Sequence, residues 1–274
     1  MSLTNEEEKN NIIKICHDIC KARNLELIFL CESGSRSWGY ASKDSDYDIR
    51  GVYVKNKMDY IYSFFCENQN NIININNKVM NINSPAVSDK YDIELWDAQK
   101  VINLYFKNAN QMPFWWVTSD IIYFKNEKGE SLTQFLIQTN EKNISKLIYH
   151  YFGIIMQKFN RNKFKIKDYI HIFRSIMCIN YAIENKQFPP QNINILLSEY
   201  KDDRIKINTT QLLKLKIQEN KVDLLETELY DSLINEYIAK IKNILNTIPK
   251  TKQFVFDDSW KNIIKILCDG PNEK

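Results

Sequence analysis

The chain has little glycine and proline, no long apolar run and no strong excess of either charge. With only 6 glycines and 6 prolines among 274 residues, long disordered linkers are not expected. No apolar run approaches the roughly 18 residues that a membrane span requires. The first eleven residues, MSLTNEEEKNN, have neither the basic n-region nor the apolar h-region of a signal peptide. We therefore expect a cytoplasmic protein without a membrane partner.

The overall composition is that of an ordinary globular protein. Hydrophobic residues make up 44% of the chain and charged residues 26%. The net charge of +3 and the pI near 8.3 are only mildly basic, which permits contact with nucleic acid but does not argue for it. The length allows one large domain or two modest ones.

The six cysteines are scattered, and without a secretion signal we expect them to be free, buried thiols. Cys16 and Cys20 could instead bind a metal, because they lie four residues apart on one face of a predicted helix, beside His17. A metal site would need two further ligands at a recognisable spacing, and none is evident. Core packing is the favoured interpretation of this pair, and a metal site is the alternative.

Hydrophobic patterns predict the secondary structure of the N-terminal part. Apolar residues at helical spacing predict a helix over residues 5–24. Runs rich in β-branched and aromatic residues predict strands at 25–31, 47–54 and 90–96. Asp97 then occupies the N-cap position of the next helix.

The remaining patterns complete the expected fold class. The Asn-rich segment 66–90 is consistent with a peripheral hairpin, turning near Asn76. From about residue 129 onward the pattern is helical. We therefore predict an α/β (α+β) protein, with a small mixed-sheet domain over residues 1–125 and an all-helical domain over residues 126–274. Residues 126–129 are the expected linker.

A pair of aspartates on the second predicted strand points to phosphate chemistry. Residues i and i+2 of a strand face the same side, so Asp46, Asp48 and Arg50 line one face. Adjacent like charges need a cation between them, and carboxylate oxygens are the ligands that Mg²⁺ prefers. Such a pair suits two ions about 3.5–4 Å apart, as in two-metal phosphoryl transfer.

A small-residue turn precedes these aspartates and predicts a phosphate-binding loop. Gly34 lets the backbone approach a ligand closely, and the start of the following helical turn attracts anions. Ser35 adds a hydroxyl. A third carboxylate from a neighbouring strand would complete the site and take the proton of an attacking hydroxyl. Asp92 is favoured for this role, as a metal ligand as well as a base, and Glu94 is the alternative.

These residues carry a resemblance to a known superfamily. The pattern of a Gly-Ser pair followed by DYD resembles the signature of DNA polymerase β superfamily nucleotidyltransferases. The fuller string GSRSWGYASKDSDYDIRGVYV is most similar to the predicted nucleotidyltransferase branch associated with RNA-repair ligases. Later segments, WDAQKVINLYFKNANQMPFWW and KDYIHIFRSIMCINYAIENKQFPP, also resemble that branch. The resemblance covers about residues 25–200, and the segment NQMPFWW departs from the family's usual Asn-Pro followed by Glu.

The resemblance implies a catalytic domain over residues 1–125 and a helical substrate-binding domain over residues 126–274. It assigns the triphosphate to Gly34 and Ser35, and Mg²⁺ (two ions, with Mn²⁺ as a substitute) to Asp46 and Asp48. Arg36 and Arg50 are implied as site residues, with structural ion pairing as the alternative.

Two features of the helical part have a structural and a functional interpretation. The basic run KFNRNKFKIKDY is either a solvated face or a strip for phosphates. Lys167 and Arg174, seven residues apart on one helix face, are the residues that the resemblance favours for triphosphate contact. Trp115 and Trp116 could stack on a base, but core packing is favoured.

Two classes of function follow. The first is an Mg²⁺-dependent nucleotidyltransferase that transfers a nucleoside monophosphate from an NTP, such as ATP, to a hydroxyl acceptor and releases pyrophosphate. The resemblance suggests an RNA 3′ end as acceptor, and a protein hydroxyl or a small molecule stays open. The second is a nucleotide-binding module, or a partner protein of the toxin–antitoxin type, with a degenerate nucleotidyltransferase fold. The position of Asp92 and Glu94 relative to the aspartate pair discriminates between the two classes.

Overall fold

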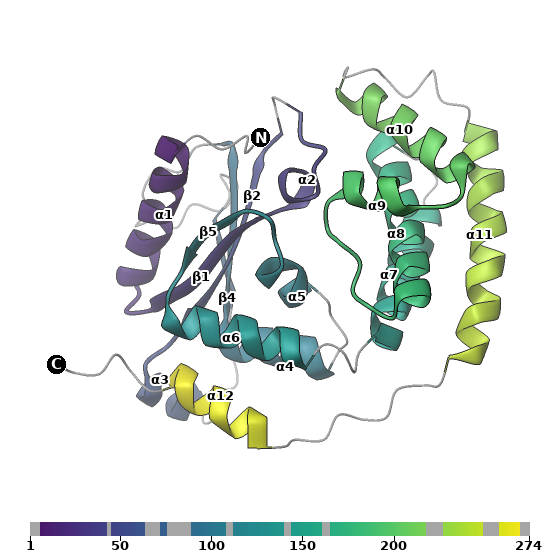
Figure 1. Cartoon of the computed structure of the whole chain (residues 1–274). Helices are drawn as coiled ribbons and strands as arrows, with labels where there is room; N and C mark the ends of the chain where they lie inside the picture. The colour runs from purple at the N-terminus through teal and green to yellow at the C-terminus, as the bar shows by residue number, and fades with distance from the viewer. Residues whose placement is uncertain are drawn as a thin grey trace. The chain divides into compact units, whose positions relative to one another are not determined.

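The computed structural model describes residues 6–42, 45–63, 72–75, 89–107, 112–139, 144–160, 165–217, 227–248 and 258–268. The chain divides into two compact units (Figure 1). Unit 1 comprises residues 1–37, 44–139 and 254–274. Unit 2 comprises residues 38–43 and 140–253.

Unit 1 is built on a mixed five-stranded sheet with the strand order β3-β4-β2-β1-β5 (Figure 1). Its strands are β1 (Glu26–Ser33), β2 (Tyr47–Val54), β3 (Ile72–Ile75), β4 (Tyr91–Asp97) and β5 (Ile122–Lys125). β2 and β4 pair in parallel, whereas the other three pairings are antiparallel. The fold class predicted from the sequence, a small mixed sheet followed by helices, is therefore confirmed.

The first helix covers one face of the sheet. α1 (Glu6–Lys21) presents Ile12, Cys16, Ile19 and Cys20 to this face, and all four side chains are buried. They pack against the residues of β1, β2, β4 and β5 that point the same way, which include Leu30, Ile49, Tyr53, Ile93, Leu95 and Tyr123. Apolar burial of this extent is the main source of stability for a small domain.

The predicted core role of the cysteine pair is confirmed by this packing. Cys16 and Cys20 are free thiols at the centre of the cluster, and burial raises the pKa of Cys20 to about 12. Among the described residues, no group of three or more His, Cys, Asp or Glu side chains could hold a metal ion. Cys66 lies outside the described residues.

Three helices follow the strands of unit 1, namely α4 (Ala98–Lys107), α5 (Met112–Val117) and α6 (Glu127–Gln138). α4 contacts β2 and β4, whereas α5 contacts β1. Asp97 caps α4 as predicted, because its Oδ1 accepts the Gln99 N–H at 2.8 Å. Trp116 is 1% exposed and packs against Trp96, with the two rings tilted by 55° and their centroids 4.3 Å apart. With Trp115 at 8% exposed, the predicted core packing of this pair is confirmed.

Residues 126–129 were expected to form a linker, and this expectation was wrong. Asn126 caps α6 by accepting the Gly129 N–H, and its own N–H donates to the carbonyl of Ile28 in β1. The segment is therefore packed on the sheet. α6 also carries Phe135, whose ring meets that of Trp260 in α12 (Asp258–Cys268) at 5.5 Å. Unit 1 thus extends to residue 139 and also includes the C-terminal helix α12. The division into a catalytic and a substrate-binding domain at residues 125 and 126 stays a prediction.

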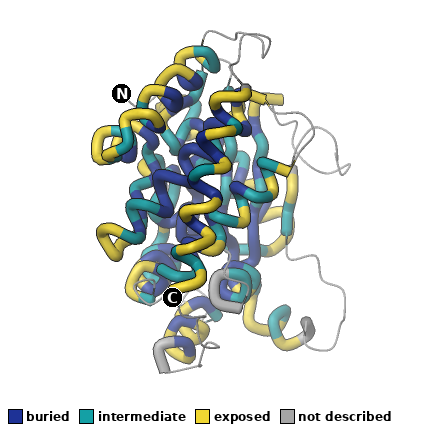
Figure 2. Tube along the Cα trace, turned by 90° about the vertical axis from the view of Figure 1, so that its right-hand side faces the viewer, coloured by how far each residue is buried: buried dark blue, intermediate teal, exposed yellow. Residues whose placement is uncertain are grey.

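Unit 2 is helical and is organised around one long helix. Its elements are α7 (Ile144–Phe159), α8 (Ile166–Asn185), α9 (Ile193–Glu199), α10 (Asp203–Ile217) and α11 (Thr227–Thr247). α8 is buried along most of its length and contacts each of the other four. Figure 2 shows the buried residues of the chain as the dark blue stretches of the trace. Tyr169 and Phe173 of α8 pack on Tyr230 of α11, with ring centroids 5.2 and 5.9 Å apart.

A short piece of the N-terminal chain is part of unit 2. The Trp38 carbonyl accepts the N–H of Ile193 at 2.9 Å, and the Arg174 guanidinium lies 4.4 Å from the Trp38 ring centroid. The Tyr40 carbonyl accepts the Lys216 ammonium at 2.9 Å. Residues 38–40 are thus held by α8, α9 and α10.

The predicted hairpin turn at Asn76 lies outside the described residues, although β3 confirms one strand of the Asn-rich segment. In the described part of the chain, no helix combines the length and the apolar character needed to cross a membrane. The cytoplasmic location stays a prediction.

The packing of α6 on β1 predicts a sharp difference between two helical glycines. A Cβ on Gly129 would overlap the Ile28 carbonyl oxygen, which is backbone and cannot rotate away. Gly129→Ala should therefore lower the free energy of unfolding by about 1–3 kcal/mol. Gly153→Ala in α7 is the control, because nothing lies within 4 Å of its Cβ position. It should raise stability by about 0.5–1 kcal/mol. Urea unfolding of both variants measures these effects, and equal stability of the two would contradict the packing argument.

Candidate active site

Parallel pairing of β2 with β4 places the predicted acidic residues side by side. Asp48 lies opposite Asp92, and Arg50 lies opposite Glu94. Alternate residues of a strand face the same side, so these four side chains share the sheet face that points away from the α1 core. The sequence predicted the two groups of acids separately, and the sheet brings them together.

Arg50 is the cation at the centre of this group. Its Nη2 donates to Asp92 Oδ2 at 2.8 Å and lies 3.6 Å from Asp48 Oδ1. Its Nε lies 3.8 Å from Glu94 Oε2. The carbonyls of Ile49 and Asp92 accept Nη1 at 2.9 and 2.7 Å. With its side chain only 12% exposed, the guanidinium is fixed in place and offsets the repulsion among three carboxylates.

Asp92 and Glu94 differ in how many of their carboxylate oxygens already have a partner within the protein. Glu94 Oε1 accepts the Trp96 indole N–H at 2.6 Å, and its Oε2 faces Arg50. Asp92 uses Oδ2 for Arg50, and its side chain is 45% exposed against 27% for Glu94. Asp92 also lies directly beside Asp48 in the register. It is therefore the better placed of the two predicted third carboxylates.

Gly34 lies against the carboxylate of Asp48. It follows Ser33, which pairs with Asp48 across the β1–β2 ladder, and it begins the short helix α2 (Gly34–Ser37). Its φ of +62° lies in the left-handed region, where a side chain is strained. A Cβ here would also overlap Asp48 Oδ2. Both constraints require glycine, so the small-residue turn and the aspartate strand form one compact structure.

Arg36 fixes the turn that leads into β2. Its guanidinium donates to the backbone carbonyls of Ser45 and Asp46 at 2.7 and 3.2 Å, and it lies 3.8 Å from the ring centroid of Tyr47. Asp46 is exposed just before β2, and Ser35 is 8% exposed at the start of α2. The contacts of Arg36 are those of the structural alternative for this residue, and its predicted role in ligand binding stays a prediction.

Glu32 lies beneath this site and was not predicted from the sequence. Glu32 is 0% exposed at the end of β1. Its Oε1 accepts the backbone N–H of Asp48 at 2.8 Å, and its Oε2 accepts the hydroxyl of Tyr123. Burial raises the pKa of Glu32 to about 7. In the sequence, Glu32 stands at the end of the apolar run LELIFLCE. A carboxylate directly after such a run was the only sign that this residue could be buried.

The donor set at this face suits a hard divalent cation. Asp48 offers a carboxylate at this face, Asp46 lies exposed just before β2, and the missing Cβ of Gly34 leaves backbone directly beside Asp48. Among the described residues, no group of three His, Cys, Asp or Glu side chains has metal-binding geometry, because Asp92 and Glu94 turn to Arg50. At this face, Asp48 and Asp92 supply carboxylate oxygens of the kind that a hard divalent cation prefers, and Asp92 shares one of its oxygens with Arg50.

The two residues predicted for triphosphate contact belong to unit 2 and differ in exposure. Lys167 is exposed at the start of α8. Arg174 is 3% exposed, donates from Nη2 to the carbonyl of Gln191 at 2.9 Å, and stacks on Trp38. Its guanidinium thus takes part in the packing of unit 2, and contact of either residue with a ligand stays a prediction.

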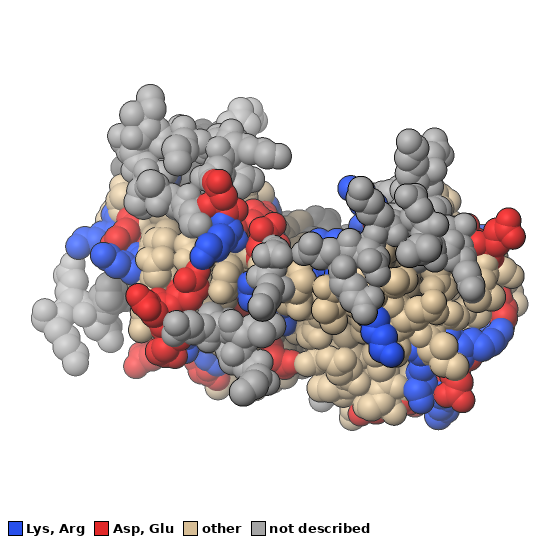
Figure 3. Space-filling view, turned by 90° about the horizontal axis from the view of Figure 1, so that it is seen from above, with Lys and Arg blue, Asp and Glu red and all other residues tan. Residues whose placement is uncertain are grey.

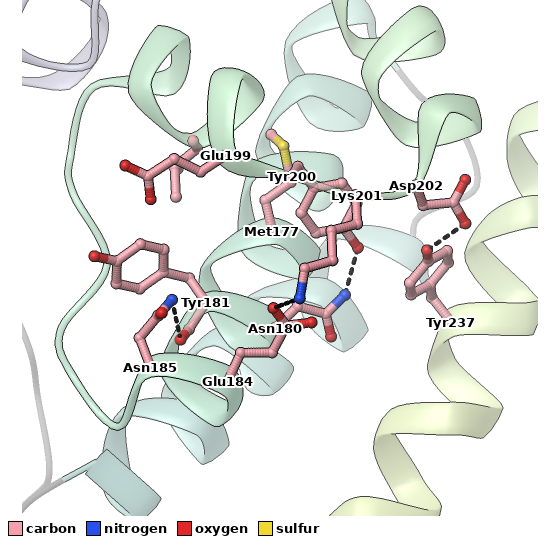
Figure 4. A pocket seen from close by; sticks show the side chains of 11 residues that line it. Met177, Asn180, Tyr181, Glu184, Asn185, Glu199, Tyr200, Lys201, Asp202 and Tyr237 are labelled. Carbon is pink, nitrogen blue, oxygen red and sulfur yellow. Dashed lines mark hydrogen bonds and ion pairs between the residues drawn. The ribbon is translucent and has the colours of Figure 1, made fainter.

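Unit 2 contains a cavity of about 310 Å³ that the sequence reading did not identify (Figure 4). Lys201 reaches Glu184 at 2.7 Å, and the Tyr237 hydroxyl donates to Asp202 at 2.7 Å. The cavity is lined by Met177, Asn180, Tyr181, Glu184, Asn185, Leu196, Glu199, Tyr200, Lys201, Asp202 and Tyr237. Its aromatic rings and hydrogen-bond acceptors suit a flat, donor-bearing group, and its carboxylates disfavour a phosphate.

No large basic field is evident on the described residues of the surface shown in Figure 3, where acidic and basic side chains lie interspersed. This agrees with the small net charge of the chain. Any attraction of a nucleic acid to this surface would be local rather than a property of the whole molecule.

Comparison with protein families decides what kind of protein carries this site. The model of the RlaP family, described as the RNA repair pathway DNA polymerase beta family, matches residues 9–263. The chain belongs to this family. As a member of the RlaP family it is a polymerase beta-type, nucleotidyltransferase-like protein of an RNA repair pathway, which confirms the resemblance found in the sequence and implies a nucleotide as substrate.

The chain is also similar to individual proteins. The Bacillus subtilis (strain 168) protein YcgL is 27% identical over 251 residues, which cover 89% of this chain and 89% of that protein. Protein 062L of Invertebrate iridescent virus 6 is 32% identical over 149 residues, which cover 54% of this chain and 82% of that protein. The crystal structure of a nucleotidyltransferase-like protein from Exiguobacterium sibiricum aligns with a TM-score of 0.32 and 13% identity, covering 87% of this chain and 74% of that one.

The contact between Gly34 and Asp48 predicts a specific energetic coupling. Gly34→Ala should cost about 1–2 kcal/mol for the left-handed backbone and a further ~1 kcal/mol for displacing the Asp48 side chain. In an Asp48→Ala background, only the backbone part should remain. Urea unfolding of the two single variants and the double variant measures the coupling.

The control for this cycle is Gly39→Ala. Gly39 also has a positive φ, of 80°, but its Cβ position meets Asn192 in unit 2. Its cost should be the same with and without Asp48. A Gly34→Ala cost that does not change in the Asp48→Ala background would contradict the contact.

Proposed function

We propose that the chain is a nucleotidyltransferase that transfers a nucleoside monophosphate from an NTP to a hydroxyl acceptor and releases pyrophosphate. The observation that carries the proposal is the meeting of Gly34, Asp48 and Asp92 on one sheet face. Family membership supplies the reaction class. The acceptor that we propose is an RNA 3′ end, because the family belongs to an RNA repair pathway, and a protein hydroxyl or a small molecule is the alternative acceptor.

Asp46 and Asp48 are the proposed ligands of two Mg²⁺ ions, for which Mn²⁺ can substitute. When bound, such ions neutralise the charge of the transferred and leaving phosphates and lower the pKa of the acceptor hydroxyl. Gly34 and Ser35 present backbone and hydroxyl groups beside Asp48, where a triphosphate would be held. The close approach of Gly34 to Asp48 supports this, because it leaves no side chain between the two.

Asp92 is the proposed third ligand and the group that takes the proton of the acceptor hydroxyl. Arg50 holds Asp92 Oδ2 at 2.8 Å and thereby orients Oδ1. Both oxygens of Glu94 already face a donor, Trp96 or Arg50. Arg50 is thus proposed to position Asp92 and to offset the charge of the acids, in place of direct contact with phosphate.

The helical part is proposed to bind the nucleotide and the acceptor. Lys167 is the better candidate for phosphate contact because it is exposed, whereas Arg174 is engaged with Gln191 and Trp38. The cavity of unit 2 offers tyrosine rings for stacking and acceptors such as the Asn180 amide for an exocyclic amino group (Figure 4).

A second candidate function is a nucleotide-binding module or partner protein without transferase activity. It is favoured by one observation, namely that Asp92 and Glu94 pair with Arg50 and leave no described group of three metal-binding side chains. This candidate predicts nucleotide binding without transfer. The same assay therefore distinguishes the two functions.

The proposal predicts label transfer that depends on the aspartate pair. With Mg²⁺, each α-³²P-labelled NTP in turn and an RNA pool, the wild-type chain should label an acceptor, and Asp46→Asn or Asp48→Asn should reduce the rate by at least about 10³-fold. Asp203→Asn is the matched control, because Asp203 is an 80% exposed acid of α10 in the other unit. Absence of transfer by the wild type, or equal transfer by the Asp48 variant, would contradict the enzymatic proposal.

The two candidate third carboxylates should differ in their effect on turnover. Asp92→Asn should lower kcat by about 10²–10⁴-fold, the range for loss of a general base. Glu94→Gln should lower it by less than about tenfold, because the amide keeps the hydrogen bond with Trp96. Single-turnover rates of both variants with saturating NTP measure the difference. A larger loss for Glu94→Gln would assign the role to Glu94 instead.

A further inference from the structure

The buried carboxylate of Glu32 touches the site from below and nothing assigns it a role. We infer that Glu32 is a positioning residue that holds Asp48 and the Gly34 turn in register for nucleotidyl transfer. The inference rests on the proposed function for its catalytic consequence. Its structural part rests on contacts among Glu32, Asp48 and Tyr123 alone.

Glu32 holds the backbone of Asp48, whose carboxylate is a proposed metal ligand. Its Oε1 accepts the Asp48 N–H at 2.8 Å, at the second residue of β2. Fixing this peptide fixes the Cα position of Asp48 and the direction of its side chain, which reaches Gly34 on one side and Arg50 on the other. The glutamate acts through another residue, because with 0% exposure it cannot touch a substrate.

The other oxygen of Glu32 is fixed as well. Oε2 accepts the hydroxyl of Tyr123, which is 4% exposed on β5. The Glu32 N–H donates to the Ile121 carbonyl at 2.9 Å. Rotation of the Glu32 side chain would therefore break its bond to Tyr123 of β5. Through Glu32, this edge strand restrains Asp48 in β2, which lies on the other side of β1.

The same network reaches the far end of α2. The Ser119 hydroxyl donates to the Glu32 carbonyl at 2.7 Å and lies 3.0 Å from the Ser37 hydroxyl. A hydroxyl has one proton, so Ser37 is the donor to Ser119. α2 is thereby held at both ends, with Gly34 against Asp48 and Ser37 against Ser119.

The two donors around Glu32 explain why a carboxylate is buried at this position. An ionisable carboxylate is costly to bury, and an amide or an apolar side chain of similar size would fill the same space at lower cost. A carboxylate offers two oxygens that accept only, which matches two donors from different strands, the Asp48 N–H and the Tyr123 hydroxyl. Through these two bonds Glu32 ties the backbone of Asp48 in β2 to the side chain of Tyr123 in β5.

The experiment compares Glu32→Gln and Tyr123→Phe with a matched control, Tyr60→Phe. Glu32→Gln keeps the shape, so the chain should fold, but its amide has one acceptor oxygen where the carboxylate has two, so the Asp48 N–H and the Tyr123 hydroxyl compete for it. Tyr123→Phe removes the partner of Oε2. Tyr60 makes an equivalent bond to a buried carboxylate, Asp97 Oδ1 at 3.0 Å, at the opposite end of β4 from Asp92. Loss of that bond should affect stability alone.

Two readouts separate a positioning role from a structural one. In transfer assays, Glu32→Gln and Tyr123→Phe should lower kcat by about 10²-fold, the cost of a misplaced catalytic group, with KM for NTP within about twofold. Tyr60→Phe should leave kcat unchanged. In hydrogen–deuterium exchange without any ligand, the amide of Asp48 should exchange faster in both Glu32→Gln and Tyr123→Phe, but not in Tyr60→Phe.

The outcomes are distinguishable from failure of the proposed function. Wild-type kcat in Glu32→Gln and Tyr123→Phe, or a loss of kcat shared equally by Tyr60→Phe, would overturn the positioning role. Unchanged exchange at Asp48 in Glu32→Gln would overturn it as well. An inactive wild-type chain would instead overturn the proposed function, while faster exchange at Asp48 would still support the contact by which Glu32 holds that residue.

Discussion

The parallel pairing of β2 with β4 is the constraint on which the candidate site depends. It places Asp48 beside Asp92 and Arg50 beside Glu94, so that four charged side chains crowd one small area of the sheet. Such crowding is tolerable only because the guanidinium lies among the acids and is tied to two carbonyls. The sheet thus produces the acidic cluster and its counter-charge from the same two strands.

The site is held mostly by backbone groups and buried side chains beneath it. Gly34 approaches Asp48 through its missing Cβ, Arg36 ties down the carbonyls before β2, and Glu32 bonds the amide of Asp48 from below. Exposed groups that could contact a ligand, such as Asp46, stand on this support. Preorganised groups of this kind lose little entropy when a ligand binds, which suits a site that must orient a triphosphate.

Local patterns predicted the strands and the small-residue turn, because β-branched runs and a Gly-Ser pair report on their own conformation. They could not predict that β2 pairs in parallel with β4, since strand pairing is set by distant parts of the chain. Glu32 was missed because a single carboxylate in an apolar strand has the same appearance whether it is buried or at the edge. Residues 126–129 resembled a linker because a polar helix start has the composition of a loop, yet Gly129 packs on Ile28.

The interleaving of the two units has a consequence for how the chain is made. Residues 38–43 belong to unit 2, and α12 belongs to unit 1 although it follows unit 2 in the sequence. During synthesis, Trp38 and Tyr40 leave the ribosome long before the helices that they contact. Phe135 likewise leaves it long before its partner Trp260. The packing of unit 2 around Trp38 and Tyr40, and that of Phe135 on Trp260 in unit 1, can therefore be completed only after the later helices have been synthesised.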